Sequence, residues 1–373
     1  MNDQEILNVM TLTLLPKLGS SNAKILYKTF GSATELFNNI DYIKDYLPNA
    51  SELLIKTLST HNDYLPRAEK ELKFADEKRI KCLSIGDSDY PQRLKDCDDA
   101  PLLIFYKGNA SLTPPKSISI VGTRHCTEYG KELCHRFVSD LREAVPDVQI
   151  ISGLAYGIDI EAHRNALDCS LDTIGVLAHG LDQIYPSSHR STAIKMLGQG
   201  GLVTEYMSGT NADKFNFVKR NRIVAGLADV TVINESKSKG GSLITADIAE
   251  SYNRDVCAFP GRVTDENSAG CNRLIQENHA NMITCADDLI KLMRWNTQPA
   301  KKKKSVQQEL FVELSENEQA VCNTLKDCDS KQINQIAVEA NIPIHEVSVV
   351  LFELEMKGII KCLNGGNYRL VRL

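Results

Sequence analysis

The sequence lacks any run of 18 apolar residues, and its N-terminus lacks the basic region followed by an apolar stretch that marks a signal peptide. We therefore expect neither a membrane span nor secretion, and we expect a cytoplasmic protein. Its eleven cysteines include no Cys-x-x-C pair, which is typical of reduced thiols rather than a disulfide framework. The nearest approach to a metal cluster, His125 and Cys126 with Cys134 and His135, matches no standard zinc spacing, so no metal is expected.

Motifs that would identify a nucleotide-dependent or hydrolytic enzyme are also missing. The chain contains no G-x-x-x-x-G-K-[ST] loop, which excludes a P-loop ATPase, and no G-x-G-x-x-G follows its first predicted strand. No Ser or Cys stands in a nucleophile elbow near His179 and Asp182. Asp159 and His163 lie four residues apart on an expected helix, where capping or packing explains them better than catalysis. We therefore expect no cofactor, and no convincing acid–base pair is found.

The chain is mildly acidic overall, but a short segment before an apolar run is strongly basic. The formal net charge is −5 and the sequence pI is near 6.0, which argues against a protein that binds nucleic acid by bulk charge. Residues 219–222, however, read Lys-Arg-Asn-Arg, so three cations occupy four positions directly before an apolar run. The pattern fits either a solvated helix face or a local anion-binding groove. The residues around the run distinguish these two interpretations.

The 373 residues predict two or three domains, and the sequence pattern changes along the chain. Residues 1–75 have helical periodicity, and their turn at residues 18–20 is typical of either a helix-hairpin-helix (SAM-like) domain or a plain small bundle. Residues 296–308 read as a polar linker with four consecutive lysines. Residues 309–373 predict three helices and a hairpin, which together indicate a winged helix.

Residues 80–295 have the features of a parallel sheet. Near-continuous apolar strands alternate with helical patterns, which is typical of a sheet covered by helices on both faces. The fold class predicted is therefore α/β, with a doubly wound, Rossmann-like parallel sheet flanked by a small N-terminal helical domain and a C-terminal winged helix. The expected strands are residues 117–121, 149–152, 173–177, 201–204, 229–233, 255–259 and 281–283.

Glycine, small polar or charged residues follow six of these strands. In an open parallel sheet, ligands bind beyond the carboxyl ends of the strands, so we expect these turns to share one edge. Turns such as Gly122 and Gly240-Gly241 expose backbone amides at the positive end of a helix, and Arg124 adds a planar fork that suits a phosphate. The expected site thus consists mainly of backbone amides and cations.

The basic run is expected at the start of a helix beside this edge. On a helix, Lys219 and Arg222 share a face while Arg220 points elsewhere, so one or two of these cations enter the groove and the others stay in solvent. Phe215 and Phe217 lie just ahead of the run. They are either stacking platforms for bases or core residues, and their residue type favours the core.

These turns, in this order, resemble the motifs of the DNA-processing protein A family, and the resemblance covers residues 80–295. The matching segments are Ile120–Arg124, Ser152–Asp159 with Ala162 and His163, Gly180–Asp182 with Tyr185 and Pro186, Arg220–Leu227, Gly240–Ala246, Pro260 with Gly261, and Gly270–Ile275. The agreement of so many blocks makes the resemblance specific, and the flanking helical and winged-helix segments also suit the family.

The resemblance implies a single-stranded DNA-binding recombination mediator that is not an enzyme. Such a protein protects incoming strands during natural transformation, loads the recombinase RecA onto them and acts as a homodimer. Binding would be independent of sequence, because phosphates carry no base information. The candidate DNA-binding residues are Gly122, Thr123, Arg124, Gly153, Arg190, Lys219, Arg220, Asn221, Arg222, Gly240, Gly241 and Ser242.

This chain departs from the family's pattern at three places. Tyr156 stands where many members carry Arg, and His179 stands where Thr or Asn is common. The segment Ser187–Arg190 follows the Tyr-Pro pair where members often carry Lys and Asn. Arg190 is therefore expected to replace the contacts of that loop.

The predicted recognition helix of the winged helix, residues 343–357, is acidic. It carries Glu346, Glu353 and Glu355, whereas a DNA-reading helix needs Arg, Lys, Asn or Gln on its outer face. Residues 309–373 as a whole contain ten acidic and six basic residues. We expect this segment not to bind duplex DNA and to serve a protein contact or regulation.

Two other functions remain open on the sequence. Gly240-Gly241-Ser242 with Glu250 resembles the Gly-Gly-x-Gly-Thr loop and downstream Glu of nucleotide phosphoribohydrolases, although Leu243 replaces the third glycine. Release of base from a nucleoside monophosphate would favour that enzyme. A small-nucleotide sensor would use the same groove, and competition between mononucleotides and oligo-dT would reveal it.

Overall fold

The computed structural model describes residues 3–295, 314–326, 328, 330–363 and 365–370. The chain forms two compact units, Met1–Ala300 and Lys301–Leu373. The first contains the predicted helical and α/β segments, and the second contains the predicted winged helix. The predicted linker at residues 296–308 lies outside the described residues. None of the helices described has the length and apolar character needed to cross a bilayer.

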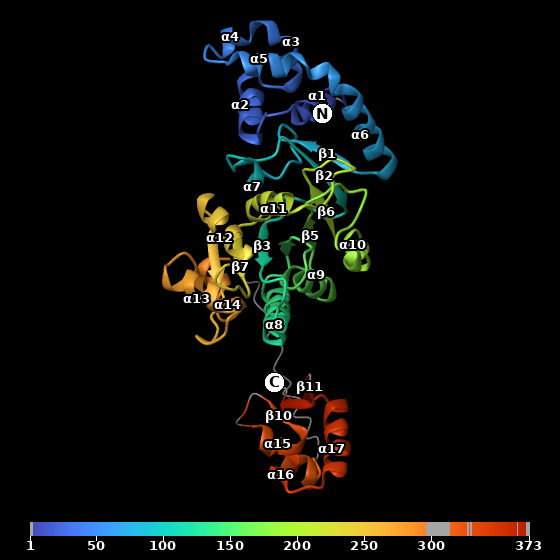
Figure 1. Ribbon diagram of the computed structural model, residues 1–373, viewed down its shortest axis with the longest axis vertical. Helices are drawn as coiled ribbons and strands as arrows, with labels where there is room; N and C mark the ends of the chain where they lie inside the picture. Colours follow the sequence, from blue (N-terminus) through green and yellow to red (C-terminus); the bar gives the residue numbers. More distant parts are fainter. Residues whose placement is uncertain (1–2, 296–313, 327, 329, 364, 371–373) are drawn as a thin grey trace. The chain divides into compact units, whose positions relative to one another are not determined.

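The N-terminal segment is helical, as its periodicity predicts. Its helices are α1 (Asp3–Leu14), α2 (Ser20–Phe30), α3 (Ala33–Asn38), α4 (Ile43–Tyr46), α5 (Glu52–Ser59) and α6 (Leu65–Lys78). Gly31 ends α2 in the left-handed region, at φ 80°, and Ser32 begins α3 by accepting a hydrogen bond from Glu35 N at 3.0 Å. In Figure 1 these helices lie above the sheet, and α1 and α6 pack on its first strand, so the helical and α/β segments share one continuous core.

The α/β segment is built on one nine-stranded sheet. Its strands are β1 (Lys81–Ser84), β2 (Leu103–Gly108), β3 (Lys116–Val121), β4 (Val148–Ser152), β5 (Thr173–Val176), β6 (Gly200–Thr204), β7 (Val230–Ile233), β8 (Asp255–Ala258) and β9 (Asn281–Met282). The order across the sheet is β1-β2-β6-β5-β4-β3-β7-β8-β9. The seven strands from β6 to β9 in that order are parallel, and they are the seven strands that the sequence predicts.

Strands β1 and β2 extend this sheet as an antiparallel edge that the sequence pattern did not reveal. β1 pairs with β2, and β2 pairs with β6. At the end of β2, a Cβ on Gly108 would lie 2.2 Å from the carbonyl oxygen of Gly200, so the close pairing with β6 requires glycine there. The prediction placed only helical and parallel-strand elements and missed this edge.

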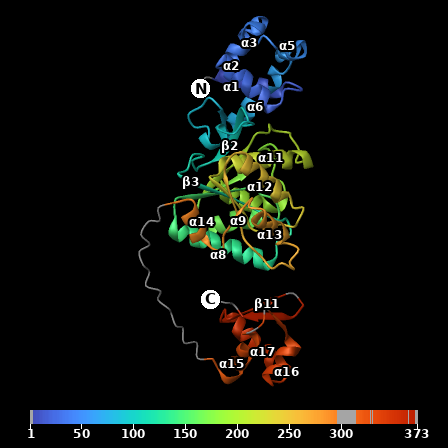
Figure 2. The same cartoon turned by 90° about the vertical axis from the view of Figure 1, so that its left-hand side faces the viewer.

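Helices cover both faces of the sheet, which confirms the predicted doubly wound α/β fold (Figures 1 and 2). On one face, Ile118 and Ile120 of β3 pack with α8, α9 and α14; on the other, Val121 belongs to the core of α11 and α12. The helices of this segment are α7 (Gln92–Lys95), α8 (Glu128–Ala144), α9 (Ile158–Asp168), α10 (Arg190–Met196), α11 (Lys214–Leu227), α12 (Gly241–Ser251), α13 (Ala269–Gln276) and α14 (Ala286–Leu292).

The chain changes its direction across the sheet at β3. From β3 it proceeds outward through β4, β5 and β6, and α11 then carries it back to β7 on the other side of β3. The carboxyl ends of β3 and β7 therefore border a crevice of the kind in which open α/β sheets bind ligands.

The second unit is a winged helix, as predicted. Three helices, α15 (Glu316–Leu325), α16 (Ile333–Ala340) and α17 (Ile344–Met356), pack around one apolar core. The strands β10 (Lys331–Gln332), β11 (Ile360–Leu363) and β12 (Asn367–Leu370) form an antiparallel sheet in the order β10-β12-β11. Ser315 and Glu318 form a capping box that begins α15.

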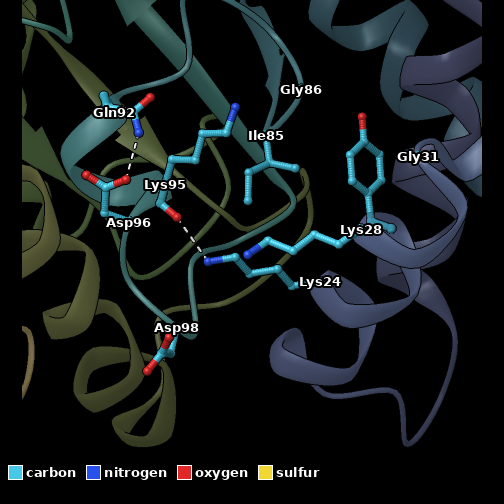
Figure 3. Close-up of a pocket in the computed structure, with 10 residues that line it drawn as sticks. Lys24, Lys28, Gly31, Ile85, Gly86, Gln92, Lys95, Asp96 and Asp98 are labelled. Atoms are coloured by element: carbon cyan, nitrogen blue, oxygen red, sulfur yellow. Dashed lines mark hydrogen bonds between the residues drawn. The ribbon is translucent and has the colours of Figure 1, made fainter.

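A cavity of about 530 Å³ opens between α2 and the residues around α7 (Figure 3). Lys24 and Lys28 extend from α2 into it, and Lys95 lines it from α7. The buried Lys24 donates from Nζ to the carbonyl oxygens of Lys95, at 3.0 Å, and Cys97. Burial and the like charge of Lys28 lower the pKa of Lys24. Lys24 thus binds carbonyls at the end of α7 and joins the helical segment to the α/β segment.

Candidate functional site

Three turns meet at the crevice between β3 and β7. Thr123 N donates to Glu235 O at 2.8 Å, and Ile158 N donates to Thr123 O at 3.2 Å, so the turns after β3, β4 and β7 are bonded to one another. A Cβ on Gly122 would lie 2.6 Å from the Ile158 side chain. Gly157 has φ +76°, and a Cβ there would lie 2.1 Å from Thr123 O. Close backbone packing therefore requires both glycines and brings the predicted turns to one place.

The Gly240-Gly241-Ser242 turn lies beside the same crevice. The hydroxyls of Ser242 and Ser236, which follows β7, hydrogen-bond at 2.9 Å. Helix α12 begins at Gly241, and no atom lies within 4 Å of a Cβ built there. The positive N-terminal end of α12 is therefore open on that side, as a phosphate-binding turn requires.

The carboxylate of Glu235, which follows β7 beside this crevice, is bound by the protein. Its side chain is buried and accepts hydrogen bonds from Thr127 N, at 2.9 Å, and Thr127 Oγ1, at 2.5 Å. Thr127 is the N-cap of α8, so the negative charge lies at the positive end of that helix. A Cβ on Gly130 would lie 2.2 Å from Glu235 Oε2, so the carboxylate in this position requires glycine there.

Arg124 and Phe217 form an exposed part of this edge. Arg124 follows β3 and is exposed, and its Cζ lies 5.3 Å from the centroid of the half-buried Phe217 ring, within cation–π range. Among the residues that the structure describes, Arg124 has no acidic partner within ion-pair distance. Its guanidinium is therefore available to a bound anion.

Arg220 lies beneath this surface. Its side chain is buried, and its guanidinium donates to the carbonyl oxygens of Gly153 and Val176, at the carboxyl ends of β4 and β5. A Cβ on Gly153 would lie 2.5 Å from the guanidinium, so glycine is required there too. Burial lowers the pKa of Arg220, Asp159 opposes that shift, and Arg124 adds to it. Arg220 therefore ties two strand ends together.

Arg222 is also buried, in a network with acidic groups. Its guanidinium bonds the Glu205 carboxylate and the backbone oxygen of Asp99, and Lys219 Nζ lies 3.3 Å from the same Glu205. Lys219 and Arg222 do share a helix face, as predicted. The expectation that cations outside the groove stay in solvent is wrong for both arginines of the run, because carbonyl and carboxylate groups at the strand ends bind their guanidinium groups.

Two further candidates occupy the borders of the site. Asn221 is half-buried and accepts a hydrogen bond from Arg220 Nε at 3.4 Å. Arg190 is exposed and is the first residue of α10. Contact with DNA by any of the candidate residues stays a prediction.

The prediction missed part of an aromatic surface at this edge. Phe215 is 73% exposed, so the prediction that it is a core residue is wrong. It lies on the first turn of α11, before the helix enters the core. The Tyr185 ring lies 5.8 Å from the Phe217 ring, and the Tyr156 ring lies 5.0 Å from the His189 ring. Tyr156 and Tyr185 are both about half exposed. Their place in polar strand-end turns was the signal that could have identified them.

Two histidines near this edge have structural roles. His163 Nδ1 bonds Thr173 Oγ1 at 2.7 Å, and burial lowers the pKa of His163 to about 3. His179 Nε2 accepts from Tyr185 N at 3.2 Å, and burial lowers its pKa as well. Both imidazoles are bonded to the protein, which supports the interpretation of His163 as a packing residue. Within the described ranges, no group of three His, Cys, Asp or Glu side chains is placed to hold a metal ion.

Residues 81–294 match the family model of DNA recombination-mediator protein A. The chain is 32% identical to the putative DNA processing protein DprA of Mycobacterium tuberculosis over 83% of its own length and 81% of that protein's. It is 38% identical to the DNA processing protein DprA of Streptococcus pneumoniae over 57% of this chain and 74% of the relative.

Two solved structures are also similar. The crystal structure of the Streptococcus pneumoniae protein matches with a TM-score of 0.66 and 31% identity, over 78% of this chain and 98% of that one. The second is a structure of DNA processing protein A from Helicobacter pylori that was described for its single-stranded DNA binding mode. It matches with a TM-score of 0.52 and 28% identity, over 58% of this chain and 96% of that one. The family match spans more than half of the sequence, and the fold agrees with that of a relative. The chain therefore belongs to the DNA recombination-mediator protein A family.

Proposed function

We propose that this protein binds single-stranded DNA along the carboxyl edge of its parallel sheet, without regard to base sequence. The observation that carries the proposal is the exposed Arg124 after β3, at a crevice where close packing of glycine brings the turns together and where the N-terminal end of α12 is open at Gly241. Backbone amides and a cation bind phosphates, which every nucleotide has. The similarity to the Helicobacter pylori protein, whose structure concerns single-stranded DNA binding, supports the same ligand.

The geometry leads us to divide the candidate residues into two groups. Residues whose side chains are exposed or half-buried, or that offer open helix amides or crevice backbone, are proposed as direct contacts, namely Gly122, Thr123, Arg124, Arg190, Lys219, Asn221, Gly240, Gly241 and Ser242. Buried residues are proposed as positioning residues, namely Gly153, Arg220 and Arg222: the protein binds the donors of the two arginines and fills the position that a Cβ on Gly153 would take. Positioning residues hold the strand ends that present the direct contacts.

The aromatic residues at this edge extend the proposal from phosphates to bases. Phe215, Tyr156 and Tyr185 are about half exposed or more, and Phe217 contacts Arg124. Every base has an apolar face, so stacking on such rings tolerates any sequence. We propose that bases stack here while the phosphates follow the amides and Arg124.

A fluorescence-anisotropy titration tests the binding proposal. Labelled oligo-dT is expected to bind much more tightly than a duplex of the same length, because only a single strand offers unstacked bases. Excess mononucleotide is expected not to displace it, since one phosphate makes few contacts. Equal affinity for duplex would contradict the proposal, and full displacement by mononucleotide would favour the small-nucleotide sensor.

The proposed cellular role follows from membership of the family. We propose that the protein, in the cytoplasm, protects incoming strands during natural transformation, loads RecA onto them and acts as a homodimer. In an assay with RecA and single-strand binding protein, the full chain is expected to accelerate RecA filament formation. Light scattering is expected to give twice the chain mass of 41.4 kDa. A single-chain mass at working concentrations would contradict the dimer.

The phosphoribohydrolase alternative has little support from the geometry. Glu250 lies on the last turn of α12, about 14 Å along the helix axis from Gly241, and it binds the exposed His279 at 2.9 Å. It therefore stands at the opposite end of the helix from the glycine turn. We propose that the protein is not an enzyme, and we expect no base release from nucleoside monophosphates.

We propose that the winged helix does not bind duplex DNA. Helix α17 carries Glu346, Glu353 and Glu355, and Lys357, which follows it, binds Glu318. Residues 309–373 are expected to leave duplex DNA unshifted in a gel, since acidic side chains repel phosphates. Tight duplex binding by this segment would contradict the proposal.

A further inference from the structure

Helix α17 has an apolar stripe on the face that the winged helix leaves uncovered. Val349, Phe352 and Met356 are 57%, 65% and 75% exposed. Their spacing of three and four residues places them on one face of the helix. The opposite face forms the core of the unit through Val347, Val350, Leu351 and Leu354. The core is therefore complete without the stripe, and folding of the unit does not explain its apolar character.

Such a stripe indicates an interaction surface. Single exposed apolar residues are common on soluble proteins, but a contiguous row that includes Phe and Met usually marks a contact with another macromolecule. Phe and Met are also enriched at protein–protein interfaces. A duplex-DNA contact is not expected here, because the stripe offers no donor to a base edge or phosphate.

The charges beside the stripe identify the kind of partner. Glu346 and Glu353 are two turns apart and lie on one flank of α17. Between Ile344 and Met356 there is no Lys or Arg. Lys357, directly after the helix, binds Glu318 at 2.5 Å and does not neutralise that flank. Glu346 has the exposed His345 ring 3.7 Å away, which is charged only when protonated. The stripe is therefore bordered by two carboxylates that have no Lys or Arg partner on the helix.

We propose that the α17 face, defined as Val349, Phe352 and Met356 with Glu346 and Glu353, docks an amphipathic helix of a partner protein. The partner helix would place an apolar side on the stripe and Lys or Arg beside the glutamates. This inference stands on the second unit alone and is independent of the proposed DNA site.

A second copy of this chain fits the α17 face less well. In an antiparallel pair with twofold symmetry, the flank of Glu346 and Glu353 would meet the same flank of the other copy. In a parallel pair, it would meet the flank that carries Glu355. Both arrangements oppose acid to acid, which disfavours self-association by like-charge repulsion.

The test uses the full chain and a synthetic probe. A labelled amphipathic peptide with Leu at helical spacing and Lys elsewhere is titrated by anisotropy, beside a control peptide in which Glu replaces every Lys. The full chain is expected to bind the Lys peptide at least about tenfold more tightly than the Glu peptide. Equal binding of both peptides, or tighter binding of the Glu peptide, would overturn the charge complementarity.

Variants separate the two halves of the proposal. F352Q/M356Q is expected to lose about tenfold in affinity for the Lys peptide, as removal of central apolar contacts does. E346Q/E353Q is expected to lose a few-fold at low salt and little at high salt. The matched control is I25Q/L53Q, which replaces two exposed apolar residues of α2 and α5 and is expected to leave peptide binding unchanged.

Folding and DNA binding are measured on the same variants. Circular dichroism and oligo-dT affinity are expected to match the wild type, because all the replaced side chains are exposed, those of α17 belong to the second unit, and Ile25 and Leu53 are not among the proposed DNA contacts. Wild-type binding of the Lys peptide by F352Q/M356Q would overturn the proposal. A second result would also overturn it: the wild type does not bind the Lys peptide, and light scattering shows that F352Q/M356Q converts a dimer into a monomer. The α17 face would then bind a second copy of the chain.

Discussion

Replacement of Arg124 by Ala tests the proposed DNA interface most directly. Arg124 is exposed, it has no acidic partner among the described residues, and its guanidinium contacts the Phe217 ring. Loss of an exposed side chain of this kind changes the free energy of unfolding by about 0.5 kcal/mol or less. The variant is therefore expected to fold normally, and a change in DNA affinity can be assigned to the interface.

The expected loss follows from the chemistry of one guanidinium–phosphate contact. A hydrogen bond to a charged group contributes about 1.5–3 kcal/mol, which corresponds to roughly 10- to 150-fold in affinity. Neutralising one phosphate fewer lowers the slope of log affinity against log salt by about 0.7 for a single strand. Between about 50 and 200 mM salt, the difference between wild type and variant is then expected to shrink about 2.6-fold.

The assay is anisotropy with oligo-dT, oligo-dA and a mixed sequence at several salt concentrations. The loss is expected to be equal for all three, because the contact is to phosphate. Arg124→Lys is expected to fall between wild type and Arg124→Ala, since Lys keeps the charge but not the planar fork. Arg142→Ala, an exposed residue on the last turn of α8, is the matched control and should bind like the wild type. If Arg124→Ala binds oligo-dT with wild-type affinity and salt slope, the interface lies elsewhere.

Three further predictions concern the residues beneath this surface. Arg222→Ala is expected to lower the free energy of unfolding by up to about 3–5 kcal/mol in urea, because the buried Glu205 keeps only the half-buried Lys219, 3.3 Å away, as a partner. Replacement of both Arg222 and Glu205 by Met should recover much of the loss, and unchanged stability with weaker DNA binding would make Arg222 a direct contact. Gly153→Ala is expected to destabilise the fold by roughly 1–3 kcal/mol, because its Cβ would lie 2.5 Å from the Arg220 guanidinium. Gly241→Ala should have little effect, because no atom lies within 4 Å of a Cβ at that position. Equal melting curves for the two variants would contradict this. Burial lowers the pKa of His163 to about 3 in the folded protein, against an ordinary value of 6.5 for the unfolded chain, so protonation favours unfolding. The contribution of His163 to stability should be complete above about pH 6.5 and fall by up to about 1.4 kcal/mol per pH unit below it. Urea unfolding of His163→Asn at pH 7 and pH 5 should lack that decrease, and a parallel decrease would assign it to other groups.

Much of the fold followed from local pattern. Buried parallel strands are near-continuous apolar runs, so all seven were identifiable from their composition and from the helices between them. The antiparallel edge was missed because β1 is short and begins with Lys, and because the pairing of β2 with β6 joins segments about a hundred residues apart. Local periodicity does not report such a pairing.

The candidate site was predictable to the same extent. The Gly122 and Gly240-Gly241 turns follow strands, and the parallel arrangement of the strands brings such turns to one edge. The burial of the arginines in the basic run was not predictable. The groups that bind them are carbonyls at the ends of β4 and β5 and the carboxylate of Glu205, which are distant from the run in the sequence. Spacing on a helix shows which side chains share a face, and it does not show what lies opposite that face.

The sequence by itself determined which residues form the parallel strands, and that turns with glycine follow these strands. These properties depend on near neighbours along the chain, whose preferences are local. Only the tertiary structure decided that Arg124 faces outward while Arg220 and Arg222 are held inside, and that α17 leaves an apolar stripe uncovered. Burial and ion pairing depend on groups distant in sequence, so they exist only once the chain has folded.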